Sequence, residues 1–241
     1  MPKIILLFFL VINLNAETLY PSWLRYGLKI VSNFGTQNEI EGYGIIINDG
    51  LILTSAQNVY RSSQIEDILL YDGSVLGDHI TCLGYAKVLA LDMNLDLAIL
   101  VPSTFTDIYC NLLPVQGNFR SLVFKESFLN LLEETQEFAL DKNSNISYMV
   151  IGDWLEFQRK TMPLGEFMSL LQIQKESFLG MPVFLNSKEF FVEDFFIGII
   201  TGKSHKTILE AKKIVQFLCE VNKKTSIFEE YPSLQENCYA N

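Results

Sequence analysis

The sequence has few of the residues on which most enzymes and metal sites depend. Only two of its 241 residues are histidines, His79 and His205, and no set of His, Asp and Glu recurs at metal-ligand spacing. We therefore expect neither a metal site nor a cofactor. His79 lies in a strand-like segment and His205 in a turn, so we interpret both as ordinary structural or surface histidines.

Positive charge is also scarce. The formal net charge is -10 and no basic cluster compensates it, so a phosphate backbone would be repelled and a nucleic-acid partner is excluded.

No apolar run is long enough to cross a bilayer. The run at 4–12 follows Lys3, and Ala16 precedes Glu17, which is typical of a secretory signal peptide over 1–16. An uncleaved N-terminal anchor is the alternative. We expect a periplasmic or secreted protein without a stable membrane span after cleavage.

In an exported protein the four cysteines are expected to form disulfides, because disulfides persist in oxidising compartments. The spacings of Cys82, Cys110, Cys219 and Cys238 match neither a zinc motif nor a redox C-x-x-C motif. Three pairings are possible, and sequence proximity favours Cys82 with Cys110 and Cys219 with Cys238. Four buried free thiols are the alternative.

Most of the chain consists of short apolar runs separated by turn residues, which predicts an all-β protein. Asn48-Asp49-Gly50 between "GIII" and "LILT" predicts a hairpin, since positive φ is accessible to all three residue types. Asp72-Gly73 predicts a second hairpin. Further strands are expected in "SYMVIGDWLEFQRK", "SLLQIQ", "MPVFLN" and "FFIGIITG".

Two segments have apolar residues at helical spacing, "KESFLNLLEETQEFA" (125–139) and "KTILEAKKIVQFLCEVNKK" (206–224). In the second, one face carries Ile208, Ala211, Ile214, Val215 and Leu218. The predicted organisation is a first β-barrel over 17–115, a connector with a helix over 116–140, a second β-barrel over 141–203, and a C-terminal helix and tail over 204–241.

Three segments in this order resemble one family. "GYGIIINDGLILTSAQNV" (42–59), "NLDLAIL" (94–100) and "SFLGMPVFLN" with "FFIGIIT" (177–201) are similar to the three catalytic segments of trypsin-like serine proteases, most closely the HtrA branch. The resemblance implies a trypsin-like double β-barrel with six strands in each barrel. Only about forty residues follow Thr201, so the PDZ domain that often follows the HtrA protease unit is not expected.

The resemblance places Gln57 at the position of the catalytic histidine, Asp96 at that of the acid and Leu179 at that of the serine nucleophile. An amide neither accepts nor releases a proton near neutral pH, and a leucine has no nucleophilic atom. We therefore expect a pseudoprotease without catalytic residues. We also expect the Gln57 amide to donate a hydrogen bond to Asp96.

The oxyanion loop of the family corresponds to Ser177, Leu179 and Gly180. Ser177 replaces a glycine that aims a backbone amide, and Met181 replaces another, so that its side chain is expected to fill the former cleft.

The function expected from this resemblance is binding: an exported scaffold subunit of a cell-envelope assembly, for example a flagellar or secretion apparatus, with protein partners and, as a further ligand, an extended peptide. The alternatives are a periplasmic serine hydrolase with a non-standard nucleophile, a peptide-binding quality-control protein and an exported β protein unrelated to the proteases.

Overall fold

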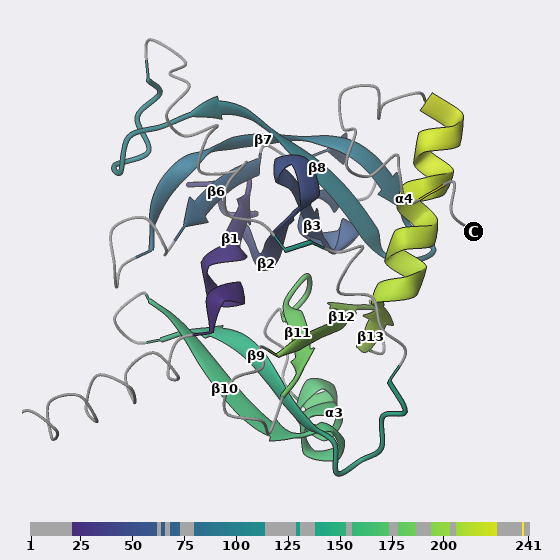
Figure 1. Ribbon diagram of the computed structural model, residues 1–241. Coiled ribbons are helices and arrows are strands. Elements are labelled where there is room, and N and C mark those ends of the chain that lie inside the picture. The colour runs from purple at the N-terminus through teal and green to yellow at the C-terminus, as the bar shows by residue number, and fades with distance from the viewer. Residues whose placement is uncertain are drawn as a thin grey trace, which may run out of the picture.

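The structure is a computed structural model that describes most of the chain after residue 20 (Figure 1). The described residues are 21–61, 64–65, 68–72, 80–113, 129–130, 138–152, 156–173, 178–186, 194–202, 206–225 and 238. Predictions for the signal peptide at 1–16 and for the strand after Asp72-Gly73 concern residues outside these ranges.

The first β unit is a closed barrel in which the strands follow the order β1-β2-β3-β8-β7-β6. Its strands are β1 (Gly27–Ser32), β2 (Ile40–Ile47), β3 (Leu51–Thr54), β6 (Ile68–Asp72), β7 (Thr81–Asp92) and β8 (Leu97–Phe105). A short pair, β4 (Tyr60–Arg61) and β5 (Gln64–Ile65), lies outside the barrel sheet. The predicted hairpin at residues 48–50 is confirmed, because the 3-10 turn η3 (Asn48–Gly50) joins the antiparallel strands β2 and β3 and Gly50 has a φ of 75°.

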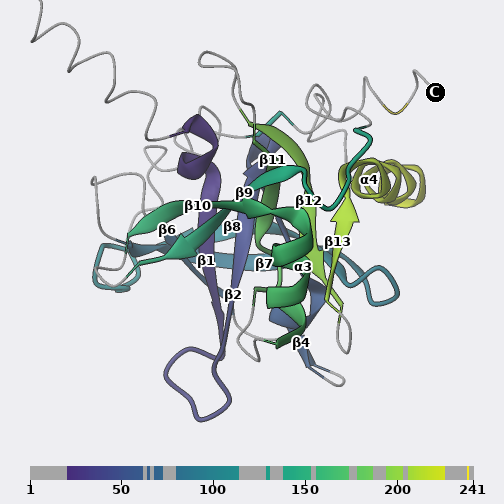
Figure 2. The same cartoon turned by 90° about the horizontal axis from the view of Figure 1, so that it is seen from below.

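The second β unit, predicted as another barrel, consists in the described residues of a single five-stranded sheet. Its order is β10-β9-β11-β12-β13, and neighbouring strands are antiparallel. The bounds are β9 (Asn145–Ile151), β10 (Phe157–Pro163), β11 (Pro182–Leu185), β12 (Phe195–Thr201) and β13 (Thr207–Glu210). Figure 1 shows the two units as separate layers of strands, and Figure 2 views the same arrangement from below, with the second sheet in front of the barrel.

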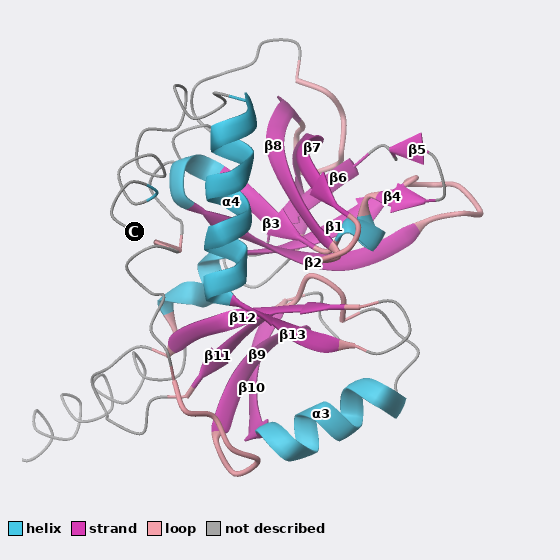
Figure 3. Ribbon diagram, turned by 90° about the vertical axis from the view of Figure 1, so that its right-hand side faces the viewer, coloured by secondary structure: helices cyan, strands magenta, loops and turns pink. Residues whose placement is uncertain are grey.

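Helix α3 (Leu164–Ile173) corrects one sequence prediction, since "SLLQIQ" was expected to be a strand. Phe167 and Leu171, four residues apart, are both buried and pack with Ile146 and Val183 of the sheet. Because residues at i and i+4 share a helix face, this pairing favours the helix over the strand. Figure 3 shows α3 lying along the outer side of the second sheet.

Helix α4 (Ala211–Thr225) confirms the predicted C-terminal helix but begins later than expected. Residues 207–210 form β13 instead, with Ile208 opposite Ile200 of β12, so Ile208 does not belong to the helical face. Of the other predicted face residues, Ala211, Ile214 and Leu218 are buried, and Val215 is partly buried against the same core.

One hydrophobic cluster joins both β units and α4. It contains Leu53 and Leu97 from the barrel, Phe184 and Ile199 from the second sheet, and Ile214 from α4. Figure 3 shows α4 running beside both units, which agrees with this shared core. The two units are therefore packed as one body rather than joined only by a linker.

The predicted connector helix at 125–139 falls almost entirely outside the described residues. Among its described residues, Leu129 is not helical: it forms a parallel bridge with Ile47, and its N–H donates to the carbonyl of Ile46. Leu129 is therefore attached to the end of β2 by an isolated bridge. In the described part of the chain, no helix has the length and apolar character needed to span a membrane.

Both favoured disulfides are present. Cys82 of β7 is bonded to Cys110 in the loop after β8, with a Cα–Cα distance of 5.1 Å. Cys219 of α4 is bonded to Cys238 in the tail, with a Cα–Cα distance of 5.4 Å. The prediction of two disulfides with these partners is therefore confirmed.

Candidate functional site

Asp96 lies at the junction of the two β units, directly before β8, and its carboxylate is buried. Gln57 belongs to the short 3-10 turn η4 (Ala56–Asn58) that follows β3. The Gln57 side-chain Nε2 donates to Asp96 Oδ2 over 2.9 Å, and the Gln57 backbone N–H donates to Oδ1 over 3.0 Å. The structure thus contains the hydrogen bond that the sequence predicts between these residues.

Two further donors, not predicted from the sequence, complete the environment of Asp96. The Ser55 hydroxyl lies 2.8 Å from both carboxylate oxygens, and the Gly202 backbone N–H donates to Oδ2 over 2.8 Å. Gly202 follows β12, so the second β unit contributes directly to a carboxylate held by the first. Four donor groups from the two β units therefore satisfy the buried Asp96 carboxylate.

The local backbone explains why Ser55 and Gln57 point toward Asp96. Ser55 is the N-cap of η4, where its side chain accepts a hydrogen bond from the Gln57 N–H. The Ala56 N–H donates to the carbonyl of Asp96, and Asp96 itself has a φ of 54°. Asp tolerates this left-handed conformation better than most residues. The N-cap pattern of a serine before a short turn was the one local signal for Ser55 in the sequence.

Leu179 lies on the other side of the same junction. Its carbonyl accepts hydrogen bonds from the Tyr43 N–H over 3.0 Å and from Asn58 Nδ2 over 2.8 Å. Both donors belong to the first unit, and Asn58 follows Gln57 directly. The junction therefore brings together all three positions that the resemblance assigns to a triad, although Leu179 participates through its backbone.

The side chain of Leu179 packs against the core of the second unit, beside Phe178 and the buried Met181. Met181 has an exposed fraction of 0%, so it fills the interior of the second unit. That this position corresponds to the cleft of the resembling proteases stays a prediction. Apolar side chains at positions 179 and 181 thus contribute packing and no reactive atom.

The turn at 178–181 is held by backbone bonds. The Met181 N–H donates to Phe178 O over 3.0 Å, and the Gly180 N–H donates to Ile200 O over 2.8 Å. The Gly180 N–H is therefore directed at β12. Ser177, predicted as part of the same oxyanion loop, lies outside the described residues.

Gly180 is required by both its conformation and its surroundings. Its φ is 77°, and a Cβ built on it would lie 2.0 Å from Tyr43 O. The backbone of the turn and the backbone of β2 thus approach more closely than any side chain permits.

One cation borders the turn. Lys206 Nζ lies 5.8 Å from the centre of the Phe178 ring, and burial lowers the pKa of the Lys206 ammonium group. The arrangement is a cation–π contact that stabilises the turn. His79 and His205 lie outside the described residues. Within the described ranges, no group of three or more His, Cys, Asp or Glu side chains has the arrangement of a metal site.

No protein-family model matches the chain, and no curated protein matches it. Among solved structures, the chain is similar to the MamO protease domain of Magnetospirillum magneticum, with 14% identity over 83% of this chain and 98% of that chain and a TM-score of 0.48. It is similar to Rv3671c of M. tuberculosis in an inactive form, with 14% identity, coverages of 85% and 90% and a TM-score of 0.48. It is also similar to the serine endoprotease of Yersinia pestis, with 13% identity, coverages of 89% and 67% and a TM-score of 0.49.

Proposed function

We propose that the chain is a catalytically inactive relative of trypsin-like serine proteases that acts as an exported binding or scaffold subunit of a cell-envelope assembly. The observation that carries the proposal is the hydrogen bond from the Gln57 amide to Asp96. In a protease triad an imidazole occupies this place, takes the proton of the nucleophile and returns it to the leaving group.

The chemistry at Gln57 supports inactivity. A carboxamide does not exchange protons near neutral pH, so it cannot act as a general base. Asp96 does not replace it, because the oxygens of its carboxylate accept from Ser55, Gln57 and Gly202.

The chemistry at Leu179 supports the same conclusion. Its side chain offers only methyl groups, and its carbonyl is engaged by Tyr43 and Asn58. These contacts join the two β units. The positions that hold the reacting groups in a protease would here hold the two β units together. The loops and the outer surface of the protein would then be available for binding.

Export is supported by the N-terminal sequence and by the two disulfides, which are compatible with an oxidising compartment. A flagellar or secretion apparatus is the kind of envelope assembly that we propose. Peptide-binding quality control and hydrolysis by a non-standard nucleophile are the competing functions.

A fluorophosphonate probe distinguishes the inactive protein from the hydrolase. The purified chain is expected to remain unlabelled under conditions in which an active serine protease is labelled completely. The hydroxyl nearest to the Asp96 carboxylate among the described contacts is that of Ser55, and Ser103, whose hydroxyl donates to Tyr85 O, provides a matched control in the barrel wall. Labelling that is abolished by Ser55→Ala and retained in Ser103→Ala would overturn the proposal.

A further inference from the structure

A short loop on the first barrel exposes apolar side chains. Residues 107–112, which we call the Tyr109 loop, follow β8 and are closed by a bridge between Thr106 and Leu112. Tyr109 is 77% exposed and Leu112 is 63% exposed, and Ile108 is also exposed. Three large apolar side chains exposed within five residues mark a candidate interaction surface.

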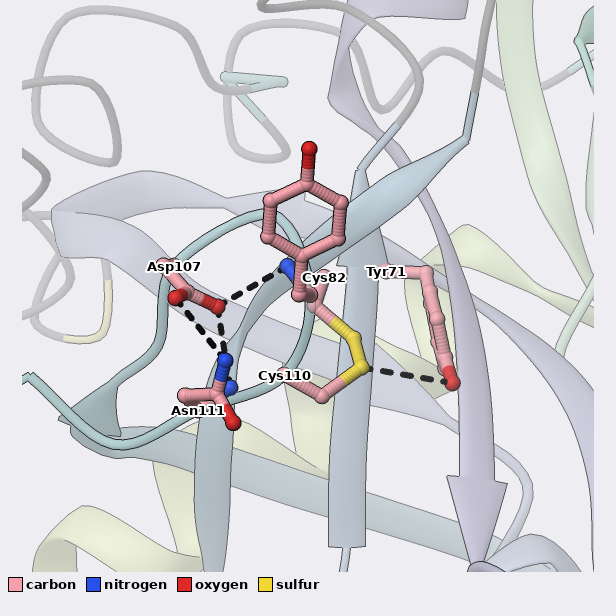
Figure 4. The surroundings of a disulfide bond; sticks show 6 residues. Tyr71, Cys82, Asp107, Cys110 and Asn111 are labelled. Carbon is pink, nitrogen blue, oxygen red and sulfur yellow. Dashed lines mark hydrogen bonds between the residues drawn. A yellow bond between two sulfur atoms is a disulfide. The ribbon is translucent and has the colours of Figure 1, made fainter.

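The Tyr109 loop is held by internal hydrogen bonds, although it is exposed. Asp107 Oδ1 accepts hydrogen bonds from the backbone N–H groups of Tyr109 and Asn111, both over 2.9 Å. Asp107 Oδ2 accepts from Asn111 Nδ2 over 3.0 Å, and the Asp107 N–H donates to Asn111 O over 2.9 Å. Figure 4 shows the Asp107 carboxylate facing Asn111 inside the loop.

The disulfide fixes this loop to the barrel. Cys110 has a φ of 68°, a conformation that few non-glycine residues adopt, and its bond to Cys82 ties it to a buried position of β7. The Tyr71 hydroxyl of β6 donates to Cys110 Sγ over 3.7 Å, as Figure 4 shows. A side chain presented from such a loop loses little conformational freedom on binding.

The apolar surface continues onto the neighbouring strands. The ring of Phe34, which is 47% exposed, meets the ring of Tyr71 edge to face with centroids 6.3 Å apart. Phe34, Tyr71 and the Tyr109 loop are thus linked by consecutive contacts. The two loops that carry exposed apolar side chains are therefore connected through Tyr71.

Acidic side chains border this surface. Glu39 and Glu41 are close enough to Tyr71 to raise the pKa of its hydroxyl further, after burial, which is the larger cause. Lys29 is the neighbouring cation: its Nζ forms an ion pair of 2.6 Å with Glu41 and lies 5.8 Å from the centre of the Tyr71 ring, so that two carboxylates stand against one ammonium group. The border therefore presents net negative charge to an approaching partner.

We propose that the Tyr109 loop is a docking surface for a protein partner that has an apolar pocket bordered by Lys or Arg side chains. This inference rests on the proposed binding role of the chain. A recess is required because the loop exposes its apolar side chains outward, and basic border residues are required by Glu39 and Glu41. A second copy of this chain would bring the same acidic border against itself, and an anionic lipid surface would be repelled.

In vivo photocrosslinking tests the location of the surface. A photoreactive phenylalanine analogue is placed at Tyr109, at Leu112 and, as a control, at Ile173, which is 79% exposed at the end of α3. We expect one protein to be crosslinked from positions 109 and 112 and not from 173, and mass spectrometry then identifies it. Crosslinks from 173 without crosslinks from 109 and 112 would show that the Tyr109 loop is not the docking surface. The proposed binding role of the chain would still stand. An absence of crosslinks from all three positions would contradict both.

Titration of the purified crosslinked protein against the full chain tests the chemistry. Tyr109→Ser is expected to weaken binding at least about tenfold, and Tyr109→Phe to weaken it less than about threefold, because the apolar ring carries the contact. Glu39→Gln with Glu41→Gln is expected to weaken binding and to flatten its salt dependence. Equal affinity of Tyr109→Ser and the wild type would overturn the inference. So would flotation of the chain with phosphatidylcholine and phosphatidylglycerol vesicles, or self-association in sedimentation, if either were abolished by Tyr109→Ser.

Discussion

Gln57 and Asp96 are joined twice, since the side-chain amide and the backbone N–H of Gln57 donate to different oxygens of the Asp96 carboxylate, over 2.9 Å and 3.0 Å. The carboxylate also accepts a bond from Gly202 in the second β unit. The pair is therefore a structural link between the two units. This interpretation makes a quantitative prediction about stability.

Asp96→Asn is expected to lower the free energy of unfolding by about 2 kcal/mol or more, because the carboxamide NH₂ must replace one of two oxygens that each accept hydrogen bonds from at least two donors. Asn adopts positive φ readily, so the backbone at 96 contributes little to the loss. Gln57→Ala removes only one donor and is expected to cost less, about 1 kcal/mol. Urea denaturation measures both values. An unchanged midpoint for Asp96→Asn would show that the link does not stabilise the protein.

A comparison of alanine substitutions at Gly180 and Gly35 separates the energetic cost of a positive φ from the cost of steric overlap. Gly180 and Gly35 have similar φ values, 77° and 74°, but a Cβ at Gly180 would lie 2.0 Å from Tyr43 O whereas a Cβ at Gly35 would meet nothing within 4 Å. Gly35→Ala is expected to cost about 1 kcal/mol, from its conformation alone. Gly180→Ala is expected to cost at least about 3 kcal/mol, since the turn at 178–181 must move away from β2. Equal losses in denaturant titrations would refute the close approach.

The sequence was most informative where local chemistry decides the structure. Asn48-Asp49-Gly50 predicted its hairpin because the turn needs a residue that accepts positive φ, and Gly50 supplies it. The C-terminal helix was predicted because Ala211, Ile214 and Leu218 repeat at helical spacing, and all three are buried. The proximity of Gln57 and Asp96 was predicted from the family resemblance, and it depends on only two adjacent strands of one barrel.

Features that depend on distant segments were missed. "SLLQIQ" is a short apolar run that fits either a strand or a buried helix, and packing of Phe167 and Leu171 on the second sheet decides for the helix. Residues 207–210 are paired with β12, and this pairing outweighs the helical pattern around Ile208. The Gly202 donor lies 106 residues from Asp96 along the chain and has no local sequence signal.

The disulfide between Cys82 and Cys110 is expected to contribute about 3 kcal/mol of stability, because it closes a loop with a sequence separation of 28. The double substitution of Cys82 and Cys110 by serine removes it and also places a hydroxyl at the buried Cys82 position, beside Val31 and Leu69. The corresponding double substitution of Cys219 and Cys238, with a separation of 19, provides a control outside this core.

Urea denaturation of the two variants in oxidising buffer measures the difference. We expect the greater loss of stability for the Cys82 and Cys110 variant, together with faster proteolysis within residues 107–112, whose anchor is removed. A larger loss for the Cys219 and Cys238 variant would show that the tail, and not the Tyr109 loop, depends more on its crosslink.

Alkaline pH provides a test of the environment of Tyr71. Burial, followed by the charges of Glu39 and Glu41, raises the pKa of the Tyr71 hydroxyl above its ordinary value of 10.0. The folded protein thus keeps this proton at a pH at which the unfolded chain has lost it. Stability associated with Tyr71 is therefore complete below about pH 10 and decreases as the pH rises through the raised folded-state pKa.

Tyr71→Phe removes this titration, so the decrease in unfolding free energy between about pH 9 and 11 is expected to be smaller in the variant than in the wild type. The variant also loses the hydrogen bond to Cys110 Sγ, but this loss lowers stability at neutral pH as well and does not change the slope. Glu39→Gln with Glu41→Gln is expected to shift the absorbance titration of Tyr71 only part of the way toward the ordinary pKa, because burial is the larger cause. Identical pH slopes for the wild type and Tyr71→Phe would mean that Tyr71 ionises with the same pKa in the folded and unfolded states, and that Glu39 and Glu41 do not form an acidic border beside it.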